Sequence, residues 1–161
     1  NKLSTINHFN NQPNLKDQLY QLCLAFIDKR IANATEALQQ AQEASNDDTK
    51  SSAGDKFETG REMAQQDINR NKQLLADAQQ QKAVLLALAD VSETEKVRSG
   101  CLVITSQGNF YISISAGQMQ VAGKAFFAIS AASPIGKLLI GKAVGEKFDF
   151  NGKVYLIEAI A

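Results

Sequence analysis

The sequence contains no tryptophan, two prolines, two cysteines and a single histidine among its 161 residues. The cysteines, Cys23 and Cys101, lie far apart in segments of unlike composition, so we expect reduced thiols in a cytoplasmic protein and no disulfide framework. The histidine, His8, lies in a polar stretch and is expected to be inert. No apolar run approaches the ~20 residues that span a bilayer, so no transmembrane helix is expected.

The chain also lacks net charge. Lys plus Arg and Asp plus Glu both number 17, which gives no bulk electrostatic attraction to nucleic acid or to anionic lipid. Any contact with a nucleic-acid machine must therefore be local. What the chain does have is apolar content, because 44% of its residues are hydrophobic. That content is enough for the cores of one or two small domains.

The composition divides the chain into three segments. Residues 1–13 are rich in Asn and lack apolar periodicity, so a flexible N-terminal segment is expected. Residues 14–92 are rich in Ala, Gln, Leu, Lys and Glu, which predicts helix. Residues 97–161 hold most of the Gly, Phe and Tyr, with several β-branched runs, which predicts sheet. The expected fold class is α+β: a long antiparallel α-helical hairpin followed by a small antiparallel β-sheet domain with one short helix.

Apolar residues in the helical segment are separated by alternating steps of three and four, the spacing of a coiled-coil seam. Asn71 falls on this seam, where a polar residue is expected to fix the register of the pairing. The seam residues are Leu24, Ile27, Ile31, Ala34, Leu38 and Ala41, then Ala64, Ile68, Leu75 and Ala78, with Val84, Leu85 and Leu88 closing the segment. The second helix is therefore expected to return along the first, in a coiled-coil hairpin ~45 Å long. At its base, four residues are expected to seat the hairpin on the second domain: Leu15, Leu19, Leu22 and Phe26.

The hairpin is expected to reverse at a tip of about residues 46–57, in a stretch rich in Asn, Asp, Ser and Gly. Asp55 is a good N-cap, and Glu58 three residues later completes a capping-box pattern at the start of the second helix. The same two carboxylates keep lone pairs that suit a hydrated Mg²⁺, provided that a partner supplies further ligands. Both a structural cap and a functional acid pair are compatible with this spacing.

The last third of the chain reads as strands separated by turn signals. Asn151-Gly152 between two β-like runs is a strong hairpin signal. Ser133-Pro134 predicts a capped helix start, and Gly141 its end. The expected strands lie within residues 97–106, 109–115, 124–130, 147–150 and 153–160.

Two stretches carry a resemblance to a known family. "SPIGKLLIGKAVGEKFDFNGKVYLIEAI", residues 133–160, resembles the carboxy-terminal signature of the bacterial Gre transcript-cleavage factors, with its Ser-Pro pair, short apolar helix, Leu-x-Gly-Lys, Val-Gly and final strand pair. "GDKFE", residues 54–58, is similar to the Gly-Asp-x-x-Glu at the tip of that family's coiled coil. In architecture the resemblance covers most of the chain.

The resemblance implies a function and a division of labour. An FKBP-like carboxy-terminal domain would dock on backtracked RNA polymerase while the hairpin reaches through the secondary channel to the nascent RNA 3′ end. Asp55 and Glu58 would help to hold the second Mg²⁺ and orient a water, so that the polymerase cleaves its own transcript. The factor would be an accessory protein and a monomer, holding no metal alone. Lys137, Lys142 and Lys147 are the residues expected to contribute to docking.

Three alternatives accompany this interpretation. The family commonly follows its Asp with Leu-Ser-Glu-Asn-Ala-Glu-Tyr, whereas residues 56–62 here read Lys-Phe-Glu-Thr-Gly-Arg-Glu. A divergent member of this kind would occupy the channel and inhibit or modulate transcription without cleavage. A second alternative is a coiled-coil interaction or oligomerisation module. A third is a peptidyl-prolyl isomerase, which would need a deep aromatic-lined pocket.

Overall fold

A computed structural model describes the backbone of residues 15–50 and 54–161 and the side chains of residues 15–46 and 60–161. The N-terminal segment expected at residues 1–13, with His8, lies outside the described residues. The chain divides into two compact units. Phe26–Lys82 forms the hairpin unit, and Ala83–Ala161 with the chain up to Ala25 forms the sheet unit. The division falls inside the two helices, whereas the composition changes only after residue 92.

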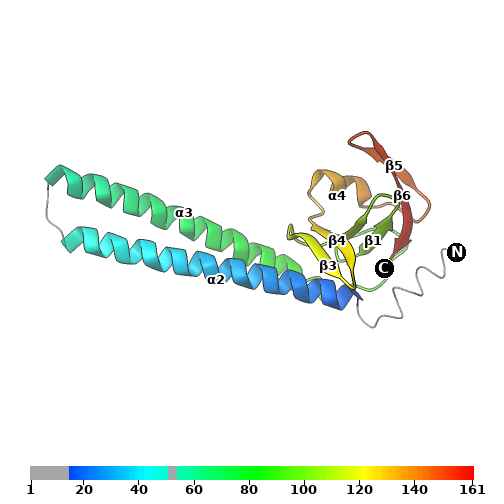
Figure 1. The fold of residues 1–161 in the computed structure, drawn as a ribbon, viewed down its shortest axis with the longest axis horizontal. Coiled ribbons are helices and arrows are strands. Elements are labelled where there is room, and N and C mark those ends of the chain that lie inside the picture. Colours follow the sequence, from blue (N-terminus) through cyan, green and yellow to red (C-terminus); the bar gives the residue numbers. More distant parts are fainter. Residues whose placement is uncertain (1–14, 51–53) are drawn as a thin grey trace. The chain divides into compact units, whose positions relative to one another are not determined.

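Two long helices dominate the first half of the chain. Helix α2 spans Leu15–Lys50 and helix α3 spans Gly54–Leu86, and within the hairpin unit they lie side by side (Figure 1). No helix in the described part of the chain is both long and apolar enough to cross a membrane.

Polar contacts between α2 and α3 fix their relative direction. Lys82 Nζ lies 2.7 Å from Asp28 Oδ1, and Arg30 Nη1 donates to Gln81 Oε1 at 3.0 Å. Residue numbers therefore rise along α2 as they fall along α3, which makes the pair antiparallel. Exposed pairs of this kind add little stability, so burial along the shared face must hold the helices together.

The stripe predicted from the spacing is the least exposed face of the hairpin unit. Its buried members are Ile27, Ala34, Ala64, Ile68, Asn71 and Ala78. Four of these six residues are Ala or Asn, so the helix surfaces meet over short side chains. Asn71 Nδ2 donates to the Asp67 carbonyl of its own helix at 2.9 Å. That bond lies within α3 and uses one of the two N–H donors of the amide.

A six-stranded sheet forms the second half of the chain. Its strands are β1 (Leu102–Thr105), β2 (Asn109–Ile112), β3 (Gly117–Val121), β4 (Lys124–Ile129), β5 (Lys147–Phe150) and β6 (Lys153–Ile160), and their order is β3-β4-β2-β1-β6-β5. Neighbours are antiparallel except for β2 and β4, which are parallel. The expectation of an antiparallel sheet was therefore wrong, and the sheet is mixed. After β2 the chain crosses to the outer edge as β3 before it returns as β4, so β4 runs in the direction of β2.

The turn and helix signals of this half are confirmed. Asn151 and Gly152 have φ of 50° and 78°, and they join β5 to β6. Helix α4 (Pro134–Leu139) begins after Ser133, whose Oγ accepts from the Gly136 N–H at 3.1 Å. Gly141, with φ of 84°, follows the end of α4.

The sheet has α4 on one face and the first turns of α2 on the other (Figure 1). On the α4 side, Leu139 packs into a core that includes Ile112 and Phe148. On the α2 side, Cys23 Sγ lies 3.7 Å from Ser113 Oγ and 3.9 Å from Met119 Sδ. The sheet is thus covered on both sides.

The base of α2 is only partly buried against the sheet. Leu15 and Leu19 are buried as expected, whereas Leu22 and Phe26 are 40% and 39% exposed. Lys16 Nζ donates to the Val91 carbonyl at 2.8 Å and so ties the chain that follows α3 to the first turn of α2. Burial lowers the pKa of this lysine. Both cysteines are buried free thiols, as predicted.

Candidate functional site

The predicted acid pair lies at the start of α3. Helix α2 ends at Lys50 and α3 begins at Gly54, so the helices extend into the tip expected at residues 46–57 from both sides. Asp55 consequently lies inside the first turn of α3 and not at its cap. The side chains of Asp55 and Glu58 lie outside the described residues.

The backbone of this helix start favours acidic residues whether or not they cap it. The first N–H groups of an α-helix have no partner within the helix, and the helix dipole places partial positive charge there. A carboxylate in the first turn is therefore stabilised in its ionised form. Positions 55 and 58 are also three residues apart, the spacing at which two helix positions are neighbours. Acidic residues at these two positions would suit a cation that other groups also hold.

The described residues 61–63, which follow the pair, are exposed. Arg61 and Glu62 are exposed, and Met63 is 62% exposed. Among the side chains that the structure describes, no three His, Cys, Asp or Glu residues are grouped as a metal site would require. The side chains of the acid pair are not among those described.

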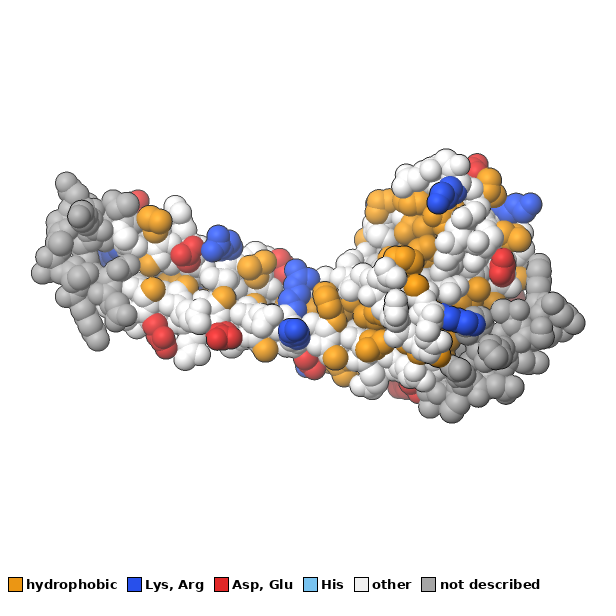
Figure 2. Space-filling model, in the orientation of Figure 1, with side chains coloured by type: hydrophobic (Ala, Val, Ile, Leu, Met, Phe, Trp, Pro, Cys, Tyr) orange, Lys and Arg blue, Asp and Glu red, His pale blue; other side chains and the backbone are white. Residues whose placement is uncertain are grey.

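The three predicted docking lysines all lie in the sheet unit, near α4 and β5. Lys137 is exposed in the last turn of α4, and Lys147 is exposed as the first residue of β5. Lys142 is half-buried, and its Nζ lies 5.9 Å from the centroid of the Phe148 ring. The ring fixes this ammonium group by a cation–π contact, while the other two have the freedom of surface side chains. On the face drawn in Figure 2, the Lys and Arg side chains of the sheet unit lie apart from one another, among hydrophobic ones.

An aromatic cluster beside these lysines was not predicted as a unit. Tyr155 stacks on Phe148 with ring centroids 5.1 Å apart, and it also meets Phe150 and Phe110 at 6.3 Å. Phe127 lies 5.9 Å from Phe110 and is 37% exposed. Phe110 and Phe148 are buried in the core of the sheet unit. These residues come together because of the order of β4, β2, β6 and β5 in the sheet, and local sequence patterns do not predict that order.

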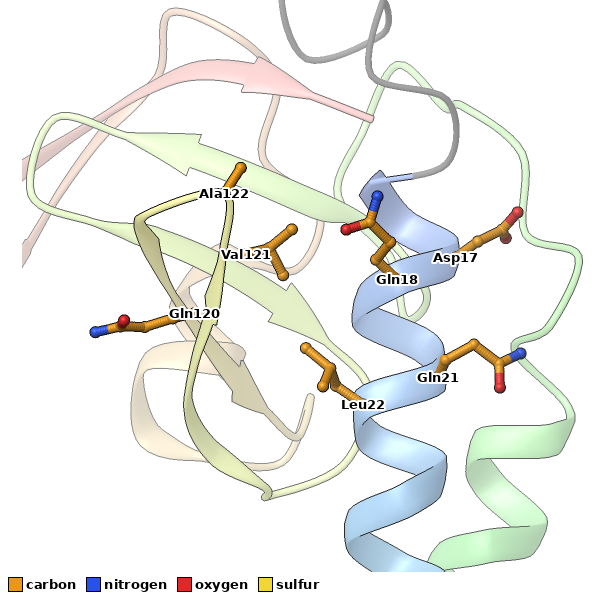
Figure 3. Close-up of a pocket in the computed structure, with 7 residues that line it drawn as sticks. All are labelled: Asp17, Gln18, Gln21, Leu22, Gln120, Val121 and Ala122. Carbon is orange, nitrogen blue, oxygen red and sulfur yellow. The ribbon is translucent and has the colours of Figure 1, made fainter.

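A hollow of about 650 Å³ lies between the first turns of α2 and the hairpin of β3 and β4 (Figure 3). The hollow is lined from α2 by Asp17, Gln18, Gln21 and Leu22, and from the β3–β4 hairpin by Gln120, Val121 and Ala122. In Figure 3, Leu22 and Gln18 point toward Val121, whereas Gln120 points away. None of these residues is aromatic, so the hollow is unlike the pocket that a prolyl isomerase needs.

No protein-family model matches the chain, and neither a curated protein nor a solved structure matches it.

Proposed function

We infer that this chain is a divergent Gre-type elongation factor, which binds RNA polymerase through the secondary channel and stimulates the polymerase's own cleavage of backtracked RNA. The observation that carries this inference is the position of the acid pair. Two antiparallel helices of 36 and 33 residues lead to Gly-Asp-x-x-Glu at the beginning of the second helix. A helix of that length spans about 50 Å, a reach suited to a buried active centre.

The finer architecture belongs to the same proposal. The two helices of the hairpin unit pack as a coiled coil, and the stripe of buried, mostly small residues supports this part of the proposal. The sheet with α4 acts as an FKBP-like docking domain in the cytoplasm, supported by the capped Ser133-Pro134 helix start and the final hairpin. Lys137, Lys142 and Lys147 lie on this domain and contribute to binding the polymerase.

The chemistry requires little of this chain beyond two carboxylates. In two-metal phosphodiester hydrolysis, one ion activates water and the other stabilises the leaving oxygen. Asp55 and Glu58 would add ligands to a Mg²⁺ that the polymerase and the RNA also hold, and would orient the water. Two protein acids without a third ligand suit such a shared ion, because Mg²⁺ keeps several waters and substrate oxygens in its shell.

The test is RNA cleavage in backtracked complexes of bacterial RNA polymerase. The unmodified chain is expected to accelerate cleavage, and Asp55→Ala/Glu58→Ala to remove at least ~100-fold of that acceleration, the scale on which misplaced groups slow a reaction. The matched control is Glu36→Ala/Glu43→Ala, which removes the same charge from exposed positions of α2. Control and unmodified chains should cleave alike, and all three proteins should bind polymerase equally.

A cleavage-inactive channel binder is the second candidate, favoured by the cations Lys56 and Arg61 that flank the acids. The same experiment separates the two candidates. If the unmodified chain binds polymerase but adds no cleavage, the second candidate is favoured: the chain inhibits or modulates transcription without cleavage. Absence of polymerase binding would overturn both candidates.

A further inference from the structure

The outer edge of β3 carries backbone groups that point away from the sheet. The two residues of its turn to β4 both have positive φ, 53° and 77°, which makes Val121 and Lys124 a hydrogen-bonded pair. The alternation of an antiparallel ladder then turns the N–H and C=O groups of Gln118 and Gln120 away from β4. β3 is the last strand on this side of the sheet, and no described residue forms a backbone hydrogen bond with these groups.

The two edges of the sheet differ in how they resist pairing. The opposite edge strand, β5, carries Lys147 and Asp149 at its outward positions, and charges on an edge discourage association. β3 reads Gly-Gln-Met-Gln-Val, with no charge and no proline. This uncharged edge is therefore the one suited to accept a further strand.

The two sides of β3 face different surroundings. Met119 Sδ lies 3.9 Å from Cys23 Sγ, so Met119 and Val121 face α2. Gln120 points to the other side (Figure 3). A strand paired with β3 follows the same alternation, because residues opposite each other share a face of the sheet. Its residues opposite Met119 and Val121 would therefore point toward α2.

The hollow of about 650 Å³ lies on the α2 side of this edge. α2 and β3 run in opposite directions along it, so that Asp17 lies toward the Ala122 end of the strand and Leu22 farther back (Figure 3). Leu22 is 40% exposed, and Asp17 is the one charged residue among the described residues that line the hollow. An added strand would thus meet an apolar side chain and a carboxylate in a fixed order.

The Asp17 carboxylate is available to a cation from outside the described structure. Its neighbour Lys16 donates instead to the Val91 carbonyl, at 2.8 Å. Asp17 is exposed, and no described residue lies within salt-bridge distance of it. A lysine on an added strand could reach this carboxylate, because its charge is carried on a flexible four-carbon stem.

We propose that the edge of β3 and the hollow beside it bind an extended peptide segment of a partner protein, antiparallel to β3, in which Lys or Arg precedes an apolar residue by two positions. The antiparallel direction is the more stable of the two per residue. The cation lies opposite Val121 and reaches Asp17, and the apolar residue lies opposite Met119 and packs against Leu22. This inference is independent of the proposed function.

Backbone and side chains divide the recognition between them. The two partner residues that alternate with the cation and the apolar residue exchange N–H···O=C bonds with Gln120 and Gln118. In strand addition of this kind, the backbone bonds supply affinity and the alternate side chains supply specificity. Asp17 and Leu22 are therefore the residues of the chain that select the partner.

The blocked peptide Ser-Lys-Thr-Val-Thr-Ser tests the pairing, because it has the required spacing and its two Thr residues carry the pairing backbone groups. It is titrated into the full chain and followed by NMR, with an expected Kd below ~1 mM. At ~5 mM peptide, the Gln118 and Gln120 amides should exchange at least ~3-fold more slowly than in the free chain. The Asp149 amide, on the edge of β5, should be unaffected.

Two control peptides separate the backbone contribution from the charge contribution. Ser-Lys-Pro-Val-Pro-Ser lacks the two backbone donors and is expected to bind at least ~10-fold more weakly, with no slowing of exchange. Ser-Glu-Thr-Val-Thr-Ser replaces the cation with an acid and is expected to bind ~3-fold or more weakly at low salt, the scale of an exposed ion pair.

A variant of the chain locates the charge preference. Asp17→Asn should remove the difference between the Lys and Glu peptides, because no carboxylate is left to distinguish them. The matched control Asp149→Asn makes the same change at the other edge of the sheet and should keep the difference. Circular dichroism melting of both variants confirms that a lost preference is not a lost fold.

Four results would overturn the proposal. Absence of any change at Gln118 and Gln120 up to ~5 mM peptide would mean that the edge does not accept a strand. Equal binding of the proline peptide would exclude backbone pairing, and a charge preference that survives Asp17→Asn would place the selecting residue elsewhere. Slow exchange in the free chain that no peptide alters would mean that the edge is already covered, by the same chain or, if it depends on protein concentration, by a second copy.

Discussion

Gly136 occupies a position in α4 where no side chain fits. A Cβ atom there would lie 2.7 Å from Ser133 Oγ and closer still to the Ser130 carbonyl oxygen, and real Cβ contacts are essentially never that short. The same carbonyl accepts from Ser133 Oγ, and Ser133 caps the helix, so the loop cannot move away without losing the cap. Gly136→Ala is therefore expected to lower the free energy of unfolding by about 1–3 kcal/mol.

Gly108→Ala is the matched control for this change. Its added Cβ would meet only the Phe110 ring, at 3.6 Å, which is an ordinary contact. Urea unfolding should place this variant within about 0.5 kcal/mol of the unmodified chain, as for most surface changes. Equal stability of Gly136→Ala and Gly108→Ala would show that the loop before α4 yields easily.

Cys23 should make the fold sensitive to alkali. Burial raises the pKa of its thiol above the ordinary value of 9.0, and the contact with Ser113 opposes this only in part. Above that value the unfolded chain loses the Cys23 proton while the folded chain keeps it. The folded state then binds more protons, so the free energy of unfolding falls as pH rises.

The comparison that isolates this effect is the unmodified chain against Cys23→Ala between about pH 7 and pH 10. Above the thiol's ordinary pKa, the free energy of unfolding should fall more steeply with pH for the unmodified chain than for the variant. The difference between the two slopes should reach up to about 1.4 kcal/mol per pH unit. Burial also raises the pKa of Tyr111, but its ordinary value is 10.0, so its titration falls at or above the end of this range. Parallel stability curves would contradict protonation of a buried thiol.

At the scale of elements, the sequence predicted those structural features that are set by residues close together in the chain. The three-four spacing from Ile27 to Ala78 identified the buried helix face, because helix geometry brings such positions to one side. Asn151-Gly152 identified a hairpin because both positions need positive φ, which Gly adopts without strain and Asn tolerates. Ser133-Pro134 identified a helix start because its hydroxyl meets an N–H of the first turn.

Structural features that depend on residues far apart in the chain were not predicted from the sequence. β3 lacks the β-branched runs of the other strands, and its register follows from pairing with β4. Ala122 takes the left-handed conformation of a hairpin turn although alanine rarely signals one. The parallel pairing of β2 with β4 follows only once β3 is known to occupy the outer edge.

The candidate site divides in the same way. The sequence located Asp55 and Glu58 near a helix start, but the polar composition of residues 46–57 predicted a loop where both helices continue. Packing along the seam can extend a helix through residues of poor propensity. The aromatic cluster beside Lys142 needed the strand order, which no local pattern encodes.

At the scale of the whole molecule, zero net charge conceals a separation of charge along the chain. Residues 15–96 hold 10 cations and 14 acids, a net charge of −4, whereas residues 97–161 hold six cations and three acids, a net charge of +3. Lys2 supplies the remaining positive charge. The sheet domain is thus the part suited to an acidic surface, and the helical part is suited to a site with bound cations. This is the polarity that the proposed division between docking and catalysis requires.

The last prediction concerns docking on RNA polymerase. Lys137→Glu/Lys147→Glu reverses two exposed charges in α4 and β5, without disturbing Lys142 over Phe148. If this surface contacts the polymerase, affinity should fall by ~10-fold or more, because each lost attraction becomes a repulsion. The effect should be larger at low salt, since exposed charges are screened by ions. Cleavage at saturating factor should be unchanged, because Asp55 and Glu58 are intact.

Arg98→Glu/Lys153→Glu is the matched control for docking, with the same change of charge at exposed positions of the sheet unit. It should leave affinity within ~2-fold, because long-range attraction alone is weak at physiological ionic strength. An equal loss of affinity in both variants would mean that Lys137 and Lys147 act only through the net charge of the sheet unit and not through direct contact. Unchanged affinity in Lys137→Glu/Lys147→Glu would remove this surface from the docking interface. Only a selective loss, with cleavage preserved at saturation, assigns contact to one part of the chain and chemistry to the other.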